Sequence, residues 1–162
     1  MNILAIAWEL KVNTPTVVVK YIKKVMAKDK FHDAVKNGLI KEGWIITDDP
    51  LYLVFGGVDL YVDLGAEKVI AAQKENQKIA VEIKSFLSYS VITDFHQAVG
   101  QVMNYRLVMQ QKEPERILYL AVPADVYKTF FQLEFTRLAI QNYQLNIIVY
   151  DIEQEAILQW EN

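Results

Sequence analysis

The first half of the chain alternates between helical and strand-like spacing of its apolar residues. Between Asp29 and Glu42 apolar residues recur every three or four positions, which predicts an amphipathic helix that Gly43 ends. The stretches that follow are rich in β-branched and aromatic residues, with Pro50 and the Gly56-Gly57 pair as turn signals. We therefore expect strands at 44–47, 51–55 and 58–64.

Two readings remain for residues 66–74, which suit either a two-turn helix or the continuation of a strand through Val69 and Ile70. A turn at 75–77 then leads into an apolar strand at 78–86. Thr93 or Asp94 can cap a long helix that runs through Met109, and residues 125–143 are mostly helical in pattern. Further strands are expected at 117–122, 146–151 and 156–160. The order predicts an α/β or α+β fold in which helices cover one sheet.

The first 25 residues fit this pattern poorly. Residues 3–8 are apolar but far fewer than the ~20 that a membrane-spanning helix needs, and no basic segment precedes them as in a signal peptide. Residues 14–19 suit a short strand or an extended arm. We interpret residues 1–25 as an N-terminal extension or the product of a misassigned start, and residues 26–162 as one cytoplasmic domain without membrane contact.

The composition limits which metal ligands this domain can offer and how it can bind DNA. The chain has no cysteine and only two histidines, so a bound metal would rest mainly on carboxylate oxygens, which Mg²⁺ and Mn²⁺ prefer. Residues 1–25 hold four of the 17 basic residues and one of the 20 acidic ones, which leaves 13 against 19, a balance of −6. This acidic body argues against a protein that coats DNA tightly through phosphate contacts.

The strand at 78–86 carries the residues of greatest chemical interest. Successive strand side chains point to opposite faces, so Glu82 and Lys84 share one face and Ile83 faces the other way. Charges on a buried strand are costly unless they are paired or bind a metal. This E-x-K pattern is half of a metal-dependent nuclease site, and Asp59 or Asp63 can supply the missing carboxylate.

Strand register decides between the two aspartates. If residues 58–64 pair antiparallel with 79–85, Asp59 lies near Lys84 and the site closes; this is the register we expect. If residues 66–74 instead continue as a strand, a hairpin about Asn76 places Ile70 opposite Glu82 and Asp59 far away. Asp63 has the same strand parity as Asp59 and is the alternative.

The spacing of these residues resembles a known nuclease pattern. The order Gly56-x-x-Asp59, Glu82-x-Lys84 and Gln101-x-x-x-Tyr105 after a first helix is similar to the PD-(D/E)XK superfamily, particularly its RecB-like branch, although Val58 stands where the superfamily's name has proline. More closely, the chain from residue 26 onward, about 137 of 162 residues, resembles the XisH family, the fdxN-element excision controlling factors of cyanobacteria. Four contiguous segments carry that resemblance: FHDAVKNGLIKEGW, DDPLYLVFGGVDLYVDLGAEK, AVEIKSF and ERILYLAVP.

The superfamily resemblance implies roles for individual residues. It implies a restriction-endonuclease-like core, a central mixed sheet flanked by helices, and Mg²⁺ or Mn²⁺ as cofactor. Asp59 and Glu82 would bind the metal with the Ile83 carbonyl, and Lys84 would orient or deprotonate the attacking water. The remaining implied residues are His32 as a further ligand, Asp63 as the alternative ligand, and Gln101 and Tyr105 on the DNA side.

Two functions of different classes follow. One is a metal-dependent DNA endonuclease, of which a toxin-like nuclease held inactive by its partner is a variant. The other is a non-catalytic accessory factor that binds DNA or a protein in programmed excision of a DNA element. The XisH resemblance implies DNA, a small XisI-like protein and a site-specific recombinase as partners, and a homo-oligomer is compatible with it.

Overall fold

A computed structural model of the protein describes residues 15–70 and 75–162. The chain divides into two compact units, residues 1–30 and 31–162. Helix α2 (Pro15–Lys41) contributes residues to both units. The strand or arm expected at 14–19 is wrong from Pro15 onward, because proline is favoured in the first turn of a helix, where its missing N–H costs nothing. No described helix is long and apolar enough to cross a membrane.

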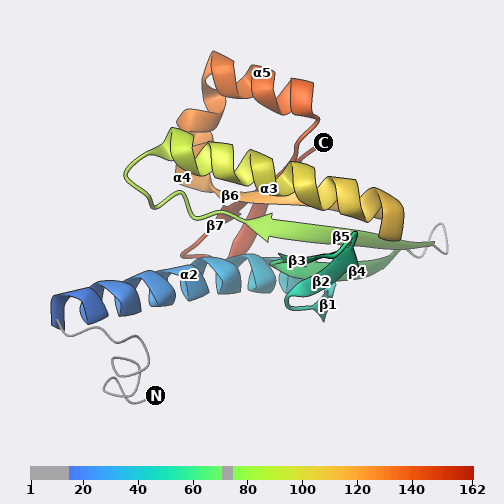
Figure 1. Ribbon diagram of the computed structural model, residues 1–162, viewed down its shortest axis with the longest axis horizontal. Coiled ribbons are helices and arrows are strands. Elements are labelled where there is room, and N and C mark those ends of the chain that lie inside the picture. Colours follow the sequence, from blue (N-terminus) through green and yellow to red (C-terminus); the bar gives the residue numbers. More distant parts are fainter. Residues whose placement is uncertain (1–14, 71–74) are drawn as a thin grey trace. The chain divides into compact units, whose positions relative to one another are not determined.

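The described residues of the second unit form eight strands in two sheets. Six of them make one mixed sheet, and the other two make a separate antiparallel pair (Figure 1). The six-stranded sheet, in spatial order, is β1 (Ile45–Asp48), β4 (Leu64–Ile70), β5 (Glu75–Ile83), β6 (Arg116–Pro123), β7 (Asn146–Asp151) and β8 (Ala156–Glu161), and the pair is β2 (Leu51–Phe55) with β3 (Val58–Val62). Strands β5, β6 and β7 run parallel to one another, and the remaining neighbours are antiparallel. A central mixed sheet flanked by helices is therefore confirmed.

The expected pairing of residues 58–64 with 79–85 is wrong. Strand β3 folds back on β2, with Val54 opposite Asp59, because Gly56 and Gly57 adopt the positive φ values of 59° and 82° that a tight hairpin turn requires. Strand β4 pairs with β5 instead, with Leu64 opposite Val81. The helix alternative for residues 66–74 is also wrong as far as Ile70, since β4 continues to that residue; residues 71–74 lie outside the described part.

Helices α3 (Val91–Lys112), α4 (Ala124–Lys128) and α5 (Glu134–Tyr143) follow the β5 and β6 strands (Figure 1). The N-cap of α3 is Ser90, which accepts a hydrogen bond from Thr93 N–H, rather than Thr93 or Asp94. The helix expected at 125–143 is broken by a 3₁₀ turn, η1 (Phe130–Gln132). At this turn Phe131 is fully buried and its ring packs against Phe95, so tertiary packing overrides the helical pattern.

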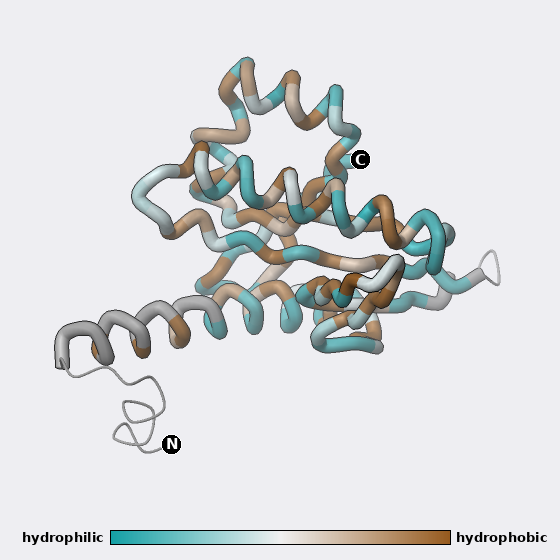
Figure 2. Tube along the Cα trace, in the orientation of Figure 1, coloured by the Kyte–Doolittle hydropathy of each residue, from teal (hydrophilic) through white to brown (hydrophobic). Residues whose placement is uncertain are grey.

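The two faces of the main sheet bury different side chains, following the two-residue period of strands. On one face Ala80, Leu120 and Val149 join the core formed with α3. On the other face Tyr150 packs edge-on against Phe31 at the end of α2 that belongs to this unit. Hydrophobic residues dominate the inner strands in Figure 2, whereas α3 alternates between hydrophilic and hydrophobic positions. The E-x-K strand is therefore covered by α3 on the face that Ala80 and Glu82 share.

Candidate functional site

The carboxyl end of β5 brings Glu82 and Lys84 toward α3. Glu82 is 5% exposed, and it has the strand parity of Ala80, which lies in the α3 core. Lys84, two residues further on, donates a hydrogen bond from Nζ to Gln97 Oε1 on α3 at 3.1 Å. The hydrogen bond places the Lys84 side chain on the side of α3, which is also the side that strand parity assigns to Glu82.

Asp63 joins this end of the sheet from the neighbouring strand. It stands immediately before β4, and its Oδ2 accepts a hydrogen bond from the backbone N–H of Ile83 at 2.8 Å. The register that sets Leu64 opposite Val81 brings Asp63 level with Glu82. The residue level with Glu82 at this end of the sheet is therefore Asp63, the alternative aspartate of the sequence analysis.

Tyr105 and Gln101 line the same site from α3. The pKa of Tyr105 is raised to about 12, first by burial and then by the negative charges of Glu82 and Asp63, whereas a hydrogen bond with Gln101 lowers it. Gln101 Nε2 donates to the Tyr105 hydroxyl at the long distance of 3.5 Å. The charges of Glu82 and Asp63 therefore both act on this phenol.

Asp59 and His32 lie elsewhere. Asp59 is exposed on the β2–β3 pair, where it hydrogen-bonds with the hydroxyl of Tyr52 and thereby raises the pKa of that tyrosine. His32 Nε2 lies 2.8 Å from Asp49 Oδ1, and Lys36 Nζ donates to the other oxygen of the same carboxylate. The structure therefore brings Asp63, rather than Asp59, level with Glu82, and both carboxylates act on Tyr105.

The donor set at this site suits a hard divalent cation. Asp63 and Glu82 offer carboxylate oxygens and Ile83 a backbone carbonyl, all of the oxygen type that Mg²⁺ and Mn²⁺ prefer. No group of three or more acidic or histidine side chains suited to a metal occurs within 15–70 and 75–162. Mg²⁺ commonly keeps several waters and binds through one or two carboxylates, so this two-carboxylate set fits it.

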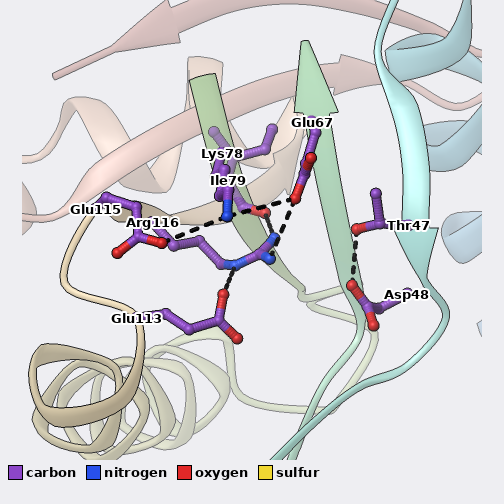
Figure 3. Close-up of polar contacts among 8 residues, drawn as sticks. All are labelled: Thr47, Asp48, Glu67, Lys78, Ile79, Glu113, Glu115 and Arg116. Atoms are coloured by element: carbon purple, nitrogen blue, oxygen red, sulfur yellow. Dashed lines mark hydrogen bonds and ion pairs between the residues drawn. The ribbon is translucent and has the colours of Figure 1, made fainter. Parts of the chain in front are cut away.

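A second charged cluster lies where β6 begins, beside Lys78 and Ile79 in the middle of β5, and its contacts hold the strands together. Figure 3 shows the Arg116 side chain between Glu113, Glu67 and the backbone of Ile79. Arg116 is only 5% exposed in its side chain, and its Nη1 donates to the Ile79 carbonyl at 2.9 Å. Its N–H groups donate to acceptors within the protein, Glu113 and the Ile79 carbonyl, so this arginine links β6 to β5 and to the end of α3.

One residue of the site was missed by the analysis of the sequence. Gln97 precedes Gln101 and Tyr105 by four and eight positions, so all three lie on one face of α3. The pattern of Gln101 and Tyr105 alone does not include Gln97, although the same spacing extended by one turn toward the N-terminus would have found it.

Comparison with known proteins gives a family match and two similar solved structures. The model of the family described as XisH protein matches residues 25–158. An XisH family protein from Nostoc punctiforme PCC 73102 is 50% identical, with a TM-score of 0.75, and the match covers 82% of this chain and 99% of that one. An fdxN element excision controlling factor protein from Anabaena variabilis is 52% identical, with a TM-score of 0.76 and coverage of 83% and 99%. No curated protein matches the sequence.

Proposed function

This chain belongs to the XisH family, and on that premise we propose that it is a divalent-metal-dependent DNA endonuclease with Asp63, Glu82 and Lys84 at its centre. The observation that carries the proposal is the hydrogen bond from Ile83 N–H to Asp63 Oδ2 at 2.8 Å. It fixes a second carboxylate beside the E-x-K strand, which is the arrangement that metal-assisted phosphodiester hydrolysis needs.

Asp63, Glu82 and the Ile83 carbonyl would hold Mg²⁺ or Mn²⁺ at this site. When bound, the cation supplies Lewis-acid polarisation of the phosphoryl oxygen. Glu82 lies on β5, Asp63 immediately precedes the neighbouring β4, and the backbone contact to Ile83 fixes the orientation of Asp63. A carboxylate held by a backbone N–H at the edge of a sheet keeps a defined position.

Lys84 and Tyr105 complete the proposed chemistry. The Lys84 ammonium offers N–H donors and a positive charge to the phosphate and to the attacking water, which it orients for attack. Because burial and the neighbouring carboxylates raise the pKa of Tyr105 to about 12, its hydroxyl stays a neutral donor at physiological pH. Gln101 contacts that hydroxyl and supports its position.

DNA rather than another phosphodiester is proposed as the substrate, since one of the similar structures is described as an fdxN element excision controlling factor. In this role the protein acts in the excision of a DNA element beside a site-specific recombinase, with an XisI-like protein as partner. A nuclease with an acidic body needs positive charge for DNA binding, and a partner protein can provide it.

A second candidate function is a non-catalytic accessory factor that uses the same fold to bind DNA or a protein. The observation that favours it is the lack of a third acidic or histidine ligand at the site in the described residues, together with the net charge of −3. In that case the carboxyl pair is a remnant and the fold provides only a binding surface.

The test is cleavage of supercoiled, linear and branched DNA by the purified full chain, with and without an XisI-like partner, in Mg²⁺, Mn²⁺ and EDTA. Asp63→Asn, Glu82→Gln and Lys84→Ala each remove one proposed group, and Asp59→Asn is the matched control. We expect metal-dependent cutting that the first three substitutions abolish and Asp59→Asn leaves intact. No cutting of any substrate by a folded parent would move the assignment to the accessory factor, and equal cutting by all variants would contradict a nuclease site at Asp63, Glu82 and Lys84.

A further inference from the structure

The Lys84 ammonium contacts the side chain of Gln97 on α3. Gln97 Oε1 accepts the hydrogen bond from Lys84 Nζ at 3.1 Å. An amide oxygen is a neutral acceptor, so it fixes the ammonium in place without neutralising its charge. A carboxylate at the same position would form an ion pair, which binds more tightly and competes with a phosphate for the same N–H donors.

The connection between the two residues is held firmly. Two residues after Lys84, Phe86 adopts a φ of 54°, a left-handed conformation that is unfavourable for a bulky side chain. Phe86 is 6% exposed, and its ring packs edge-on against Phe131 at 5.5 Å. The surrounding core therefore maintains this strained turn, which bends the chain away from the strand direction directly after Lys84.

Polar contacts fasten the rest of the same loop to α3. The buried Asp94 accepts a hydrogen bond from Ser88 N–H at 3.1 Å, and Ser90 caps the helix through Thr93 N–H. Asp94 lies one helical turn before Gln97, so the loop is anchored close to the acceptor of the Lys84 ammonium. The strand that ends at Ile83 and the helix that presents Gln97 are thus joined by a loop that is fixed at both ends.

We propose that Gln97 is the positioning residue of the site, which orients the Lys84 ammonium so that its remaining N–H donors face the carboxylate pair of Asp63 and Glu82. This inference rests on the proposed nuclease function of the same site. It adds that the second turn of α3, which carries Gln97, controls how Lys84 meets the phosphate. Gln97 acts through Lys84 and makes no bond to the substrate in this role.

Three variants of the full chain test this role. Gln97→Leu removes the acceptor at similar size, Gln97→Glu keeps an acceptor and adds a negative charge, and Gln111→Leu is the control on an exposed position of the same helix. The first measurement needs neither DNA nor metal: the rate at which acetic anhydride acylates Lys84, followed by mass spectrometry. Circular dichroism checks that each variant is folded.

We expect Gln97→Leu to raise the acylation rate of Lys84 by about 2- to 10-fold, the equivalent of one net hydrogen bond, because the Lys84 side chain is no longer held by an acceptor on α3. Gln97→Glu should lower the rate below that of the parent, since a carboxylate acceptor holds the Lys84 side chain more tightly than an amide oxygen does. Gln111→Leu should leave it unchanged. Equal rates in the parent and Gln97→Leu would overturn the proposal.

The second measurement is the steady-state kinetics of DNA cleavage. Gln97→Leu should lower kcat by about 10-fold or more with little change in KM, since orientation of a catalytic group acts on the chemical step. Gln97→Glu should also lower kcat, because its carboxylate competes with the phosphate for the N–H donors of Lys84. If the parent itself fails to cut DNA, the proposed function fails while the acylation rates still decide whether Gln97 holds Lys84.

Discussion

Asp63 Oδ2 and the backbone N–H of Ile83 form a 2.8 Å hydrogen bond across the end of the β4–β5 pair. The bond joins the residue just before β4 to the last residue of β5, beyond the final register pair of Leu64 and Val81. A carboxylate that accepts a backbone N–H has a fixed orientation as well as a fixed place. This contact therefore sets the position of Asp63 relative to its neighbour Glu82.

The first prediction concerns the stability that this contact contributes. Asp63→Ala leaves the Ile83 N–H without its acceptor, so the free energy of unfolding should fall by about 1–3 kcal/mol. Asp59→Ala, on the exposed hairpin, should change it by less than about 0.5 kcal/mol. Urea unfolding measures both, and amide hydrogen exchange at Ile83 should accelerate only in Asp63→Ala. Equal losses for the two variants would contradict the assignment of Asp63 to the site.

The second prediction concerns the ionisation of Tyr105, whose pKa is raised to about 12 by burial and by the nearby charge of Glu82. In the unfolded chain a tyrosine has a pKa of about 10. The folded chain therefore holds this proton more tightly, and the resulting stability is fully present below about pH 10 and lost as the pH rises to about 12. The loss should reach about 2–3 kcal/mol.

The test is to measure the unfolding free energies of the parent and Tyr105→Phe at intervals above about pH 9. Phenylalanine has no proton to lose, so this pH-dependent loss of stability should be absent from the variant. The difference between the two proteins should shrink as the pH rises. Glu82→Gln should also lower the pKa of Tyr105, because it removes the negative charge. The titration of Tyr105 in this variant is obtained by subtracting the tyrosinate absorbance of Glu82→Gln/Tyr105→Phe from that of Glu82→Gln. An unchanged Tyr105 titration in Glu82→Gln would show that the two side chains are further apart than the structure has them.

The third prediction compares two helical glycines. A Cβ atom at Gly38 would lie 3.0 Å from Ile157 Cδ1 and 3.1 Å from the Ile157 backbone nitrogen, whereas one at Gly100 would meet no atom within 4 Å. Gly38→Ala should therefore destabilise the fold by about 1–3 kcal/mol despite the better helix propensity of alanine.

Gly100→Ala should instead stabilise the protein by up to about 1 kcal/mol, because alanine loses less backbone entropy in a helix. Thermal unfolding of the two variants and the parent, at one protein concentration, should show a lower Tm for Gly38→Ala and a higher Tm for Gly100→Ala than for the parent. A stabilising Gly38→Ala would mean that α2 and β8 pack less closely than the distances to Ile157 indicate.

The fourth prediction concerns the buried arginine of the second charged cluster. Arg116→Met leaves the Ile79 carbonyl without its donor and Glu113 without its partner, so the free energy of unfolding should fall by about 2–4 kcal/mol. Arg116→Lys should recover less than half of that loss, since an ammonium cannot reproduce the planar fork of donors.

Lys128→Met, on an exposed position of α4, is the matched control and should cost less than about 0.5 kcal/mol. Urea unfolding of the three variants provides the comparison. Because Arg116 contacts neither Lys84 nor Gln97 in the described part of the chain, a destabilised but folded Arg116→Lys should keep the acylation rate of Lys84. A changed rate would reveal coupling along β5 between Ile79 and Lys84.

The sequence by itself determined the local elements and the chemistry of the E-x-K strand. The spacing of apolar residues gave the first helix of the domain, the helix from Val91 and the strands around Glu82, because helical and strand periods are properties of neighbouring residues. The placement of Glu82 and Lys84 on one face follows from the same two-residue period. The family resemblance rests on contiguous sequence segments, so it required no three-dimensional information.

Only the tertiary structure decided which aspartate joins that strand. The Gly56-Gly57 turn closes β3 onto β2, so Asp59 leaves the main sheet and Asp63 takes the place beside Ile83. Local patterns could not choose between these registers, since Asp59 and Asp63 have the same parity and the choice depends on which strands pair at long range. The acceptor for Lys84 was hidden for the same reason: Gln97 lies thirteen residues away, and only packing of α3 on the sheet brings the two side chains together.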